Sequence, residues 1–218
     1  GEVIMGINQM LMKLAEGMAT SCWIFGITLL FSLPLGMVIA FGRMSKKRIV
    51  QGITKIYISI MRGTPLMLQL MVVYFGPYYL FGIKISPFYR NIAVVIGFVL
   101  NYAAYFAEIY RSGIESMPVG QYEAAEILGY SKSQTFLHII LPQVIKRILP
   151  SVTNEVITLV KDTSLAFVIA VSEMFTIAKA LASSQTSMVP YVAAGIFYYV
   201  FNFLVAWIME KIEKHLSY

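Results

Sequence analysis

The chain has 218 residues, of which 58% are hydrophobic and 13% are charged. A soluble domain usually carries about 25% charged residues, so this composition excludes an ordinary soluble protein and predicts one membrane domain over residues 1–218. The net charge of +6 could indicate nucleic-acid binding, but we assign it to loops at a membrane surface. The one cysteine, Cys22, excludes an internal disulfide, and no His/Cys cluster has the spacing of a metal site.

The chain begins with an amphipathic stretch, residues 1–18, which we expect to lie as a helix on the outer membrane interface. Membrane-spanning helices follow, because several segments offer close to the ~20 apolar residues that a bilayer requires. The first apolar run continues past any signal-peptide cleavage pattern, so we expect it to be retained as a span. In chain order the expected spans are residues 19–42, 64–82, 91–110, 143–162 and 188–209.

The span over residues 143–162 is the weakest prediction, because it contains several polar and charged side chains. After it, residues 163–187 are rich in Ser and Thr and are expected to form short helices on the outer side. Basic residues gather in the loops after the first and third spans and at the C-terminus. Since such residues remain in the cytoplasm, we expect the N-terminus outside and the C-terminus inside.

The cytoplasmic loop between the third and fourth spans, about residues 112–142, predicts a short helix, a tight turn and a second helix. Gly129 supplies the left-handed residue that a helix end favours. Ser131 and Gln134 have the spacing of a capping box for the second helix, and Pro142 is expected to end or kink it. These residues alone leave two interpretations open: a passive elbow at the interface, or a rigid lever that a soluble partner pushes.

The same loop resembles that of inner-membrane permease subunits of ATP-binding cassette importers. Their pattern is E-A-A, three residues, G, nine residues, I, one residue, L-P. The chain matches it with Glu123-Ala124-Ala125, Gly129, Ile139 and Leu141-Pro142. Two further stretches resemble the polar amino acid branch of this family. They are RGTPL at 62–66 followed by Gln69-Leu70, and Asn154-Glu155 followed by KDTS at 161–164.

The resemblance implies an all-α membrane protein with five transmembrane helices and a cytoplasmic coupling helix over residues 119–128. It implies a permease subunit, in a bacterial inner membrane, of an ATP-driven importer of polar amino acids. Glu123, Ala124, Ala125 and Gly129 would couple the chain to an ATPase. An ion-gradient-driven carrier working alone, with acidic residues of the fourth span as its ion-coupling groups, is the alternative, but it leaves the loop unexplained.

The chain itself is expected to need no cofactor and to hydrolyse no ATP. Its sequence has no phosphate-binding loop of the G-x-x-x-x-G-K-[ST] type, so ATP and Mg²⁺ would be bound by the partner ATPase. The partners that the resemblance implies are two ATPase subunits, a second permease subunit, identical or different, and an extracytoplasmic solute-binding protein. Membrane lipid surrounds such a subunit, and no nucleic acid is expected.

Ionisable residues inside a span are costly, so they predict a functional site. At 1.5 Å per residue, Glu155 lies about 18 Å into the fourth span, and Asp162 lies about 10 Å further along the same helical face. Asn101 falls near the middle of the third span, which runs in the opposite direction. With Tyr105 and Thr158, these side chains are expected to bind an amino acid substrate, the carboxylates facing its ammonium group or a cationic side chain.

Structural roles stay open for several of these residues. Glu155 could hold helices together by an internal pair, Asp162 could cap the fourth span, and Asn101 could form an interhelical hydrogen bond. Glu108 and Arg111 have the spacing of a surface ion pair. Arg62, at the entry to the second span, is expected to anchor its helix at the lipid headgroups.

Overall fold

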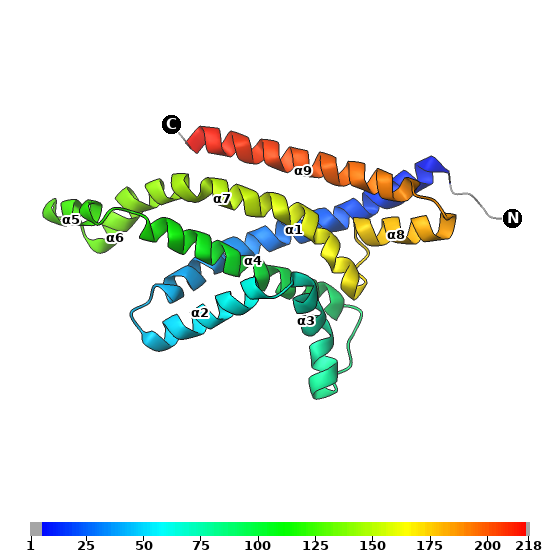
Figure 1. Cartoon of the computed structure of the whole chain (residues 1–218), viewed down its shortest axis with the longest axis horizontal. Helices are drawn as coiled ribbons and strands as arrows, with labels where there is room; N and C mark the ends of the chain where they lie inside the picture. The colour runs from blue at the N-terminus through cyan, green and yellow to red at the C-terminus, as the bar shows by residue number, and fades with distance from the viewer. Residues whose placement is uncertain (1–5, 217–218) are drawn as a thin grey trace.

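The computed structural model describes residues 6–216, and all regular secondary structure in this range is helical (Figure 1). Within residues 6–216, three helices, α1, α4 and α9, are long and apolar enough to cross a bilayer. Two bent pairs raise the number to five if each pair counts as one span; α2 and α3 meet at 111°, and residues Lys132–Ile169 meet α8 at 59°. The elements are α1 (Ile7–Arg43), α2 (Arg48–Gly63), α3 (Leu66–Phe81), α4 (Tyr89–Glu115), α5 (Val119–Ile127), α6 (Lys132–Gln134), the π-helix η1 (Thr135–Ile140), α7 (Leu141–Asp162), the 3₁₀-helix η2 (Thr163–Ile169), α8 (Met174–Gln185) and α9 (Val189–Leu216).

The N-terminal stretch differs from the sequence-based expectation. Residues 7–18 form the first turns of α1 rather than a separate helix on the membrane surface; residues 1–5 lie outside the described range. The apolar side of these turns is covered by protein, because Met10 and Leu14 are buried against Met174 and Leu181 of α8. With no helix breaker before the apolar run and a protein surface to cover it, the helix continues without interruption.

Helix α1 packs closely against α8 and α4 along a row of small residues; Gly17 and Ser21 contact α8, and Gly36 contacts α4. The small residues of this row are buried on one side of α1 and are mostly four residues apart. They are Gly17, Ser21, Thr28, Ser32 and Gly36. Small side chains at this spacing let two helix backbones approach each other, which is a common way to pack helices in membranes. A β-carbon on Gly36 would lie 2.8 Å from Cβ of Phe106 and 3.1 Å from the carbonyl oxygen of Ala103.

We expect Gly36→Leu to lower the free energy of unfolding by about 2 kcal/mol, because overpacking a close contact forces neighbouring groups apart. Thermal or denaturant unfolding of the purified protein measures the change. Gly26→Leu is the matched control, since Gly26 lies on an exposed side of the same helix with no atom within 4 Å of the position that a β-carbon would take. Equal stability losses for the two variants would contradict this account of the α1–α4 contact.

The basic stretch after α1, expected as a loop, folds instead as α2. A sharp elbow at Gly63-Thr64-Pro65 then separates α2 from α3. Proline lacks an N–H and restrains the residue before it to extended backbone, and Thr64 has φ −124° and ψ 148°. Helix α3 matches the expected span 64–82 closely, but its 16 residues reach only about 24 Å.

The helix–turn–helix unit between α4 and α7 has the expected conformation. Gly129 follows α5 with φ +81°, in the left-handed region. Ser131 and Gln134 form both hydrogen bonds of the capping box at the start of α6. Pro142 does not end the second helix, which passes through η1 directly into α7. The wider π-helical turn before Pro142 explains this, since it relieves the contact between a proline ring and the preceding turn.

The segment after α7 forms short helices, as expected, and is fixed by a buried acid. Glu173, between η2 and α8, is completely buried. Its carboxylate accepts hydrogen bonds from the backbone N–H groups of Phe175 and Thr176, which caps the N-terminus of α8. It also accepts a hydrogen bond from the hydroxyl of Tyr198 at 3.0 Å, so one carboxylate ties α8 to α9.

Candidate functional site

The five predicted substrate-binding residues line one cavity of about 330 Å³, which we call the acidic cavity. Antiparallel helices α4 and α7 supply them at helical spacings, so that residues three, four or seven apart share a face. The other lining side chains come from the start of α3, from α4 and from η2. The full lining is Thr64, Pro65, Leu66, Asn101, Tyr102, Tyr105, Glu155, Thr158, Asp162 and Leu165.

The two carboxylates of the acidic cavity differ in their partners. Oδ2 of Asp162 accepts a hydrogen bond of 2.7 Å from the hydroxyl of Tyr102, a side chain that is 2% exposed. Glu155 is half-buried, and no group within residues 6–216 donates a hydrogen bond to it. An acid at this depth without an internal donor among the described residues is suited to a ligand cation.

Asn101 has a structural role at the elbow as well as a place in the cavity wall. Its Nδ2 donates to Oε1 of Gln69 at 2.9 Å and to the carbonyl oxygen of Met61 at 3.3 Å. Nε2 of Gln69 donates to the carbonyl oxygens of Met61 and Thr64. The break between α2 and α3 leaves backbone carbonyl groups without helical partners, and these two side-chain amides donate hydrogen bonds to them. An unsatisfied backbone group is costly in a membrane.

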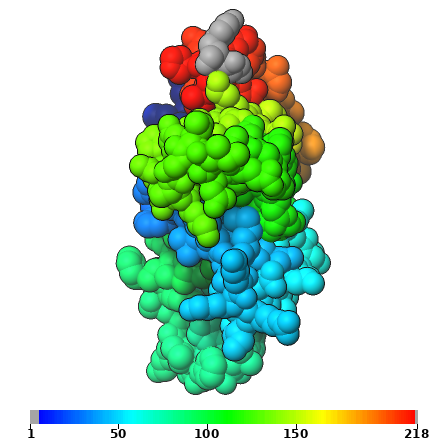
Figure 2. Space-filling model, turned by 90° about the vertical axis from the view of Figure 1, so that its left-hand side faces the viewer, coloured from blue at the N-terminus to red at the C-terminus, as the bar shows by residue number. Residues whose placement is uncertain are grey.

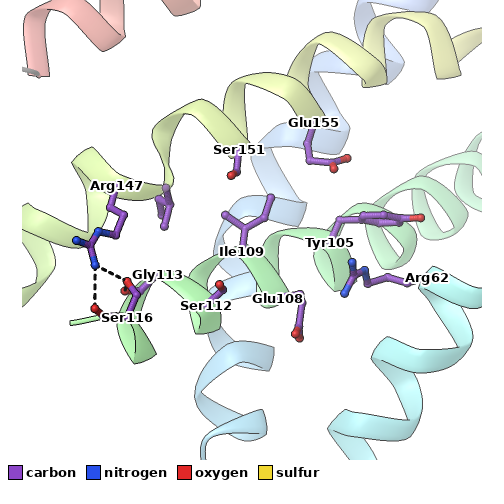
Figure 3. Close-up of a pocket in the computed structure, with 11 residues that line it drawn as sticks. Arg62, Tyr105, Glu108, Ile109, Ser112, Gly113, Ser116, Arg147, Ser151 and Glu155 are labelled. Carbon is purple, nitrogen blue, oxygen red and sulfur yellow. Dashed lines mark hydrogen bonds between the residues drawn. The ribbon is translucent and has the colours of Figure 1, made fainter. Parts of the chain in front are cut away.

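A second cavity of about 320 Å³, the serine cavity, adjoins the first, and its lining includes residues near the end of α4 and the start of α7 (Figure 3). It shares Tyr105 and Glu155 with the acidic cavity. Nη1 of Arg147 donates to the carbonyl oxygen of Ser116 at 2.8 Å and to its hydroxyl at 2.9 Å, which ties α7 to the end of α4. The other lining residues are Arg62, Glu108, Ile109, Ser112, Gly113, Ile148 and Ser151.

Two charged residues that line this cavity, Arg62 and Glu108, are ones for which the sequence predicts a position at the membrane surface. Glu108 and Arg111 form the expected ion pair, to which Glu115 adds a second carboxylate. Arg62 is exposed at the end of α2, and its guanidinium lies over the ring of Tyr105, 5.4 Å from the ring centroid. No pattern in the sequence indicated this contact, because it depends on the elbow between α2 and α3.

The four predicted coupling residues lie on α5 or directly after it. Helix α5 projects from one end of the molecule in Figure 1, and the same end faces the viewer in Figure 2. Glu123 and Ala124 are exposed, whereas Ala125 is 1% exposed and faces the chain's own helices. The large apolar residues Ile127 and Leu128 are 86% and 73% exposed. An apolar surface on a projecting helix is typical of a protein contact.

Helix α5 is fixed to α7 by a reciprocal pair of amides. Nε2 of Gln121 donates to Oε1 of Gln143 at 2.9 Å, and Nε2 of Gln143 donates back to Oε1 of Gln121 at 2.7 Å. Tyr122 packs on the main core, and burial raises the pKa of its phenol. The projecting helix is therefore joined to a long helix that lines both cavities.

Comparison with known proteins identifies the family. Residues 32–218 match the family described as binding-protein-dependent transport system inner membrane component. The chain belongs to this family. The permease is 38% identical to the L-cystine transport system permease protein TcyL of Bacillus subtilis (strain 168), over 97% of its own length and 90% of the relative's. It is 37% identical to the arginine transport system permease protein ArtQ of the same organism, over 93% and 91% of the two chains.

A solved structure supports the same assignment. A crystal structure of an amino acid ABC transporter with histidines matches with a TM-score of 0.84 and 29% identity, over 93% of the permease and 94% of that chain. The resemblance drawn from the loop motif is thus confirmed, and the permease is an inner-membrane component of an ABC importer rather than its ATPase. Within the described part of the chain, no group of His, Cys, Asp or Glu is arranged to hold a metal ion.

Proposed function

We propose that the permease forms one half of the translocation pathway of an ATP-driven importer of polar amino acids. Helices α1, α3, α4, α7 and α9 serve as its five spans, with the N-terminus outside and the C-terminus in the cytoplasm. Figure 1 supports this orientation, because α5, the α1–α2 connection and the C-terminal end of α9 lie at the same end of the molecule. The α1–α2 connection carries Lys46 and Lys47, and the end of α9 carries Lys211 and Lys214, as cytoplasmic segments do.

Helix α5 is the coupling helix in this proposal, and its placement is the observation that carries it. It projects beyond the helical bundle, bears Glu123 and exposed apolar side chains, and is joined to α7 through Gln121 and Gln143. A groove of a partner ATPase receives it, and ATP with Mg²⁺ is bound and hydrolysed there. Movement of α5 is then transmitted along α7 to Glu155 and Asp162.

The acidic cavity is the proposed substrate site. Glu155 and Asp162 attract the ammonium group or a cationic side chain, while Thr158 and Tyr105 offer hydroxyl groups and Asn101 offers an amide. The relatives' names include cystine and arginine permeases, which supports a zwitterionic or cationic amino acid. Two permease subunits face each other across the pathway, two ATPase subunits dock on the cytoplasmic side, and a solute-binding protein delivers substrate from outside.

Purification of the permease with the proteins produced alongside it tests this proposal. We expect an ATPase to accompany the chain, and its activity to rise when the solute-binding protein presents a polar amino acid. If no ATPase travels with the chain, and if deletion of α5 leaves amino acid uptake intact, the proposal is wrong. Transport by the chain alone, driven by a proton or sodium gradient, would support a carrier that needs no ATPase.

A further inference from the structure

Arg62 lies at the boundary between the two cavities, where the proposed function gives it no task. It lines the serine cavity, whereas Thr64 and Pro65, two and three residues further along the chain, line the acidic cavity. The guanidinium of Arg62 is 5.4 Å from the ring centroid of Tyr105, which lines both cavities. The elbow between α2 and α3 therefore places a cation on an aromatic ring at the junction of the two cavities.

The charges around Arg62 favour a mobile cation. In Figure 3 the Tyr105 ring lies between Arg62 and Glu155, and the Arg62 side chain points toward Tyr105 and Glu108. The positive charge of Arg62 acts on both carboxylates. Within residues 6–216, however, Arg62 forms an ion pair with neither, and Glu108 is paired with Arg111 instead. A cation–π contact is weaker than a buried ion pair, so it can break and re-form during a transport cycle.

Hydrogen bonds of residues close to Arg62 in α2 fix the backbone that carries it to α4. The hydroxyl of Tyr57 donates to the carbonyl oxygen of Leu100. One residue further along α4, Nδ2 of Asn101 donates to the carbonyl oxygen of Met61. These contacts place the end of α2 one helical turn from Tyr105, so the position of Arg62 is set by the fold while its side chain keeps freedom to move.

We propose that Arg62 is a movable gate between the acidic cavity and the serine cavity. Stacked on Tyr105, its guanidinium closes the passage, and its charge repels inorganic cations that the carboxylates would otherwise draw through. When the side chain moves onto Glu155 it replaces a departing substrate cation. The inference rests on the proposed function for the direction of release, which is toward the serine cavity and α5.

The test measures whether a thiol reagent on the cytoplasmic side reaches the acidic cavity. Cys22→Ser removes the native thiol of the chain, Thr158→Cys places a thiol in the acidic cavity, and Ser151→Cys places one in the serine cavity. Inside-out vesicles from cells producing the transporter are treated with a small, membrane-impermeant, cationic methanethiosulfonate. The rate of labelling of this chain is recorded with Arg62 present, with Arg62→Ala and with Arg62→Lys.

We expect Thr158→Cys to react slowly when Arg62 is present and at least about tenfold faster with Arg62→Ala, because a cationic barrier has been removed. Arg62→Lys keeps the charge and should keep most of the protection. Ser151→Cys is the matched control and should react rapidly in every background. Co-purification of the partner subunits reports on assembly, and Arg62→Gln replaces Arg62→Ala if that variant does not assemble.

The gate is excluded if Thr158→Cys reacts at the same rate with and without Arg62, or if it reacts as fast as Ser151→Cys while Arg62 is in place. Neither ATP nor an amino acid is added in this experiment. Labelling that does not depend on Arg62 therefore contradicts the gate without contradicting the proposed import function. Failure to recover an ATPase with the permease contradicts the import function without affecting the labelling result.

Discussion

Gly129→Val should lower ATP-driven amino acid uptake by roughly thirtyfold. Gly129 has φ +81°, and a β-branched residue in the left-handed region costs on the order of 2 kcal/mol, which corresponds to that factor in the population of the turn. Among the described residues, no atom lies within 4 Å of the position that a β-carbon would take, so the effect is expected to come from backbone strain rather than from a clash. Uptake of labelled amino acid by cells or by vesicles supplied with ATP measures it.

Gly129→Asn is the matched control, because asparagine tolerates left-handed backbone far better than valine does. We expect the asparagine variant to retain most of the uptake. The turn matters for coupling because it joins α5 to the helix that continues through η1 into α7. Equal uptake by the valine and asparagine variants would show that the left-handed turn does not matter for coupling.

The placement of much of the candidate site could be predicted from the sequence because it depends on local rules. Glu155, Thr158 and Asp162 share one face of a helix at spacings of three and four residues, and the cost of charges in a bilayer points to function. The turn at Gly129 and the capping box at Ser131 are likewise local, since each depends on a few neighbouring residues. The structure places these groups as local geometry requires.

The remaining features depend on contacts between distant segments. Nothing near residue 62 in the sequence shows that its side chain reaches Tyr105, because the 111° elbow and the amides of Gln69 and Asn101 decide that. Residues 7–18 looked like a surface helix because their apolar side had no visible partner. That partner is α8, more than 150 residues later in the chain, and no periodicity in the N-terminal stretch could reveal it.

Glu155→Gln is expected to produce the largest effect at the proposed substrate site. The change keeps the size of the side chain and removes the charge that both cavities share. A hydrogen bond to a charged group contributes about 1.5–3 kcal/mol, so the concentration of amino acid that half-saturates the ATPase should rise at least about tenfold. The assembled transporter, titrated with arginine, glutamine and cystine, provides the measurement, and arginine should show the largest shift if its side chain contacts Glu155.

Glu210→Gln on α9 is the matched control for this substitution. Glu210 is exposed and forms a 2.6 Å ion pair with Lys214 one turn away, so its neutralisation should leave the titration unchanged. Since Glu155 has no donor within the described residues, its replacement leaves no internal partner unsatisfied, and a shift would report on the ligand itself. An unchanged titration for Glu155→Gln would exclude Glu155 as a substrate ligand. Asp162 or the partner permease subunit would then have to bind the substrate cation, and the family assignment would still hold.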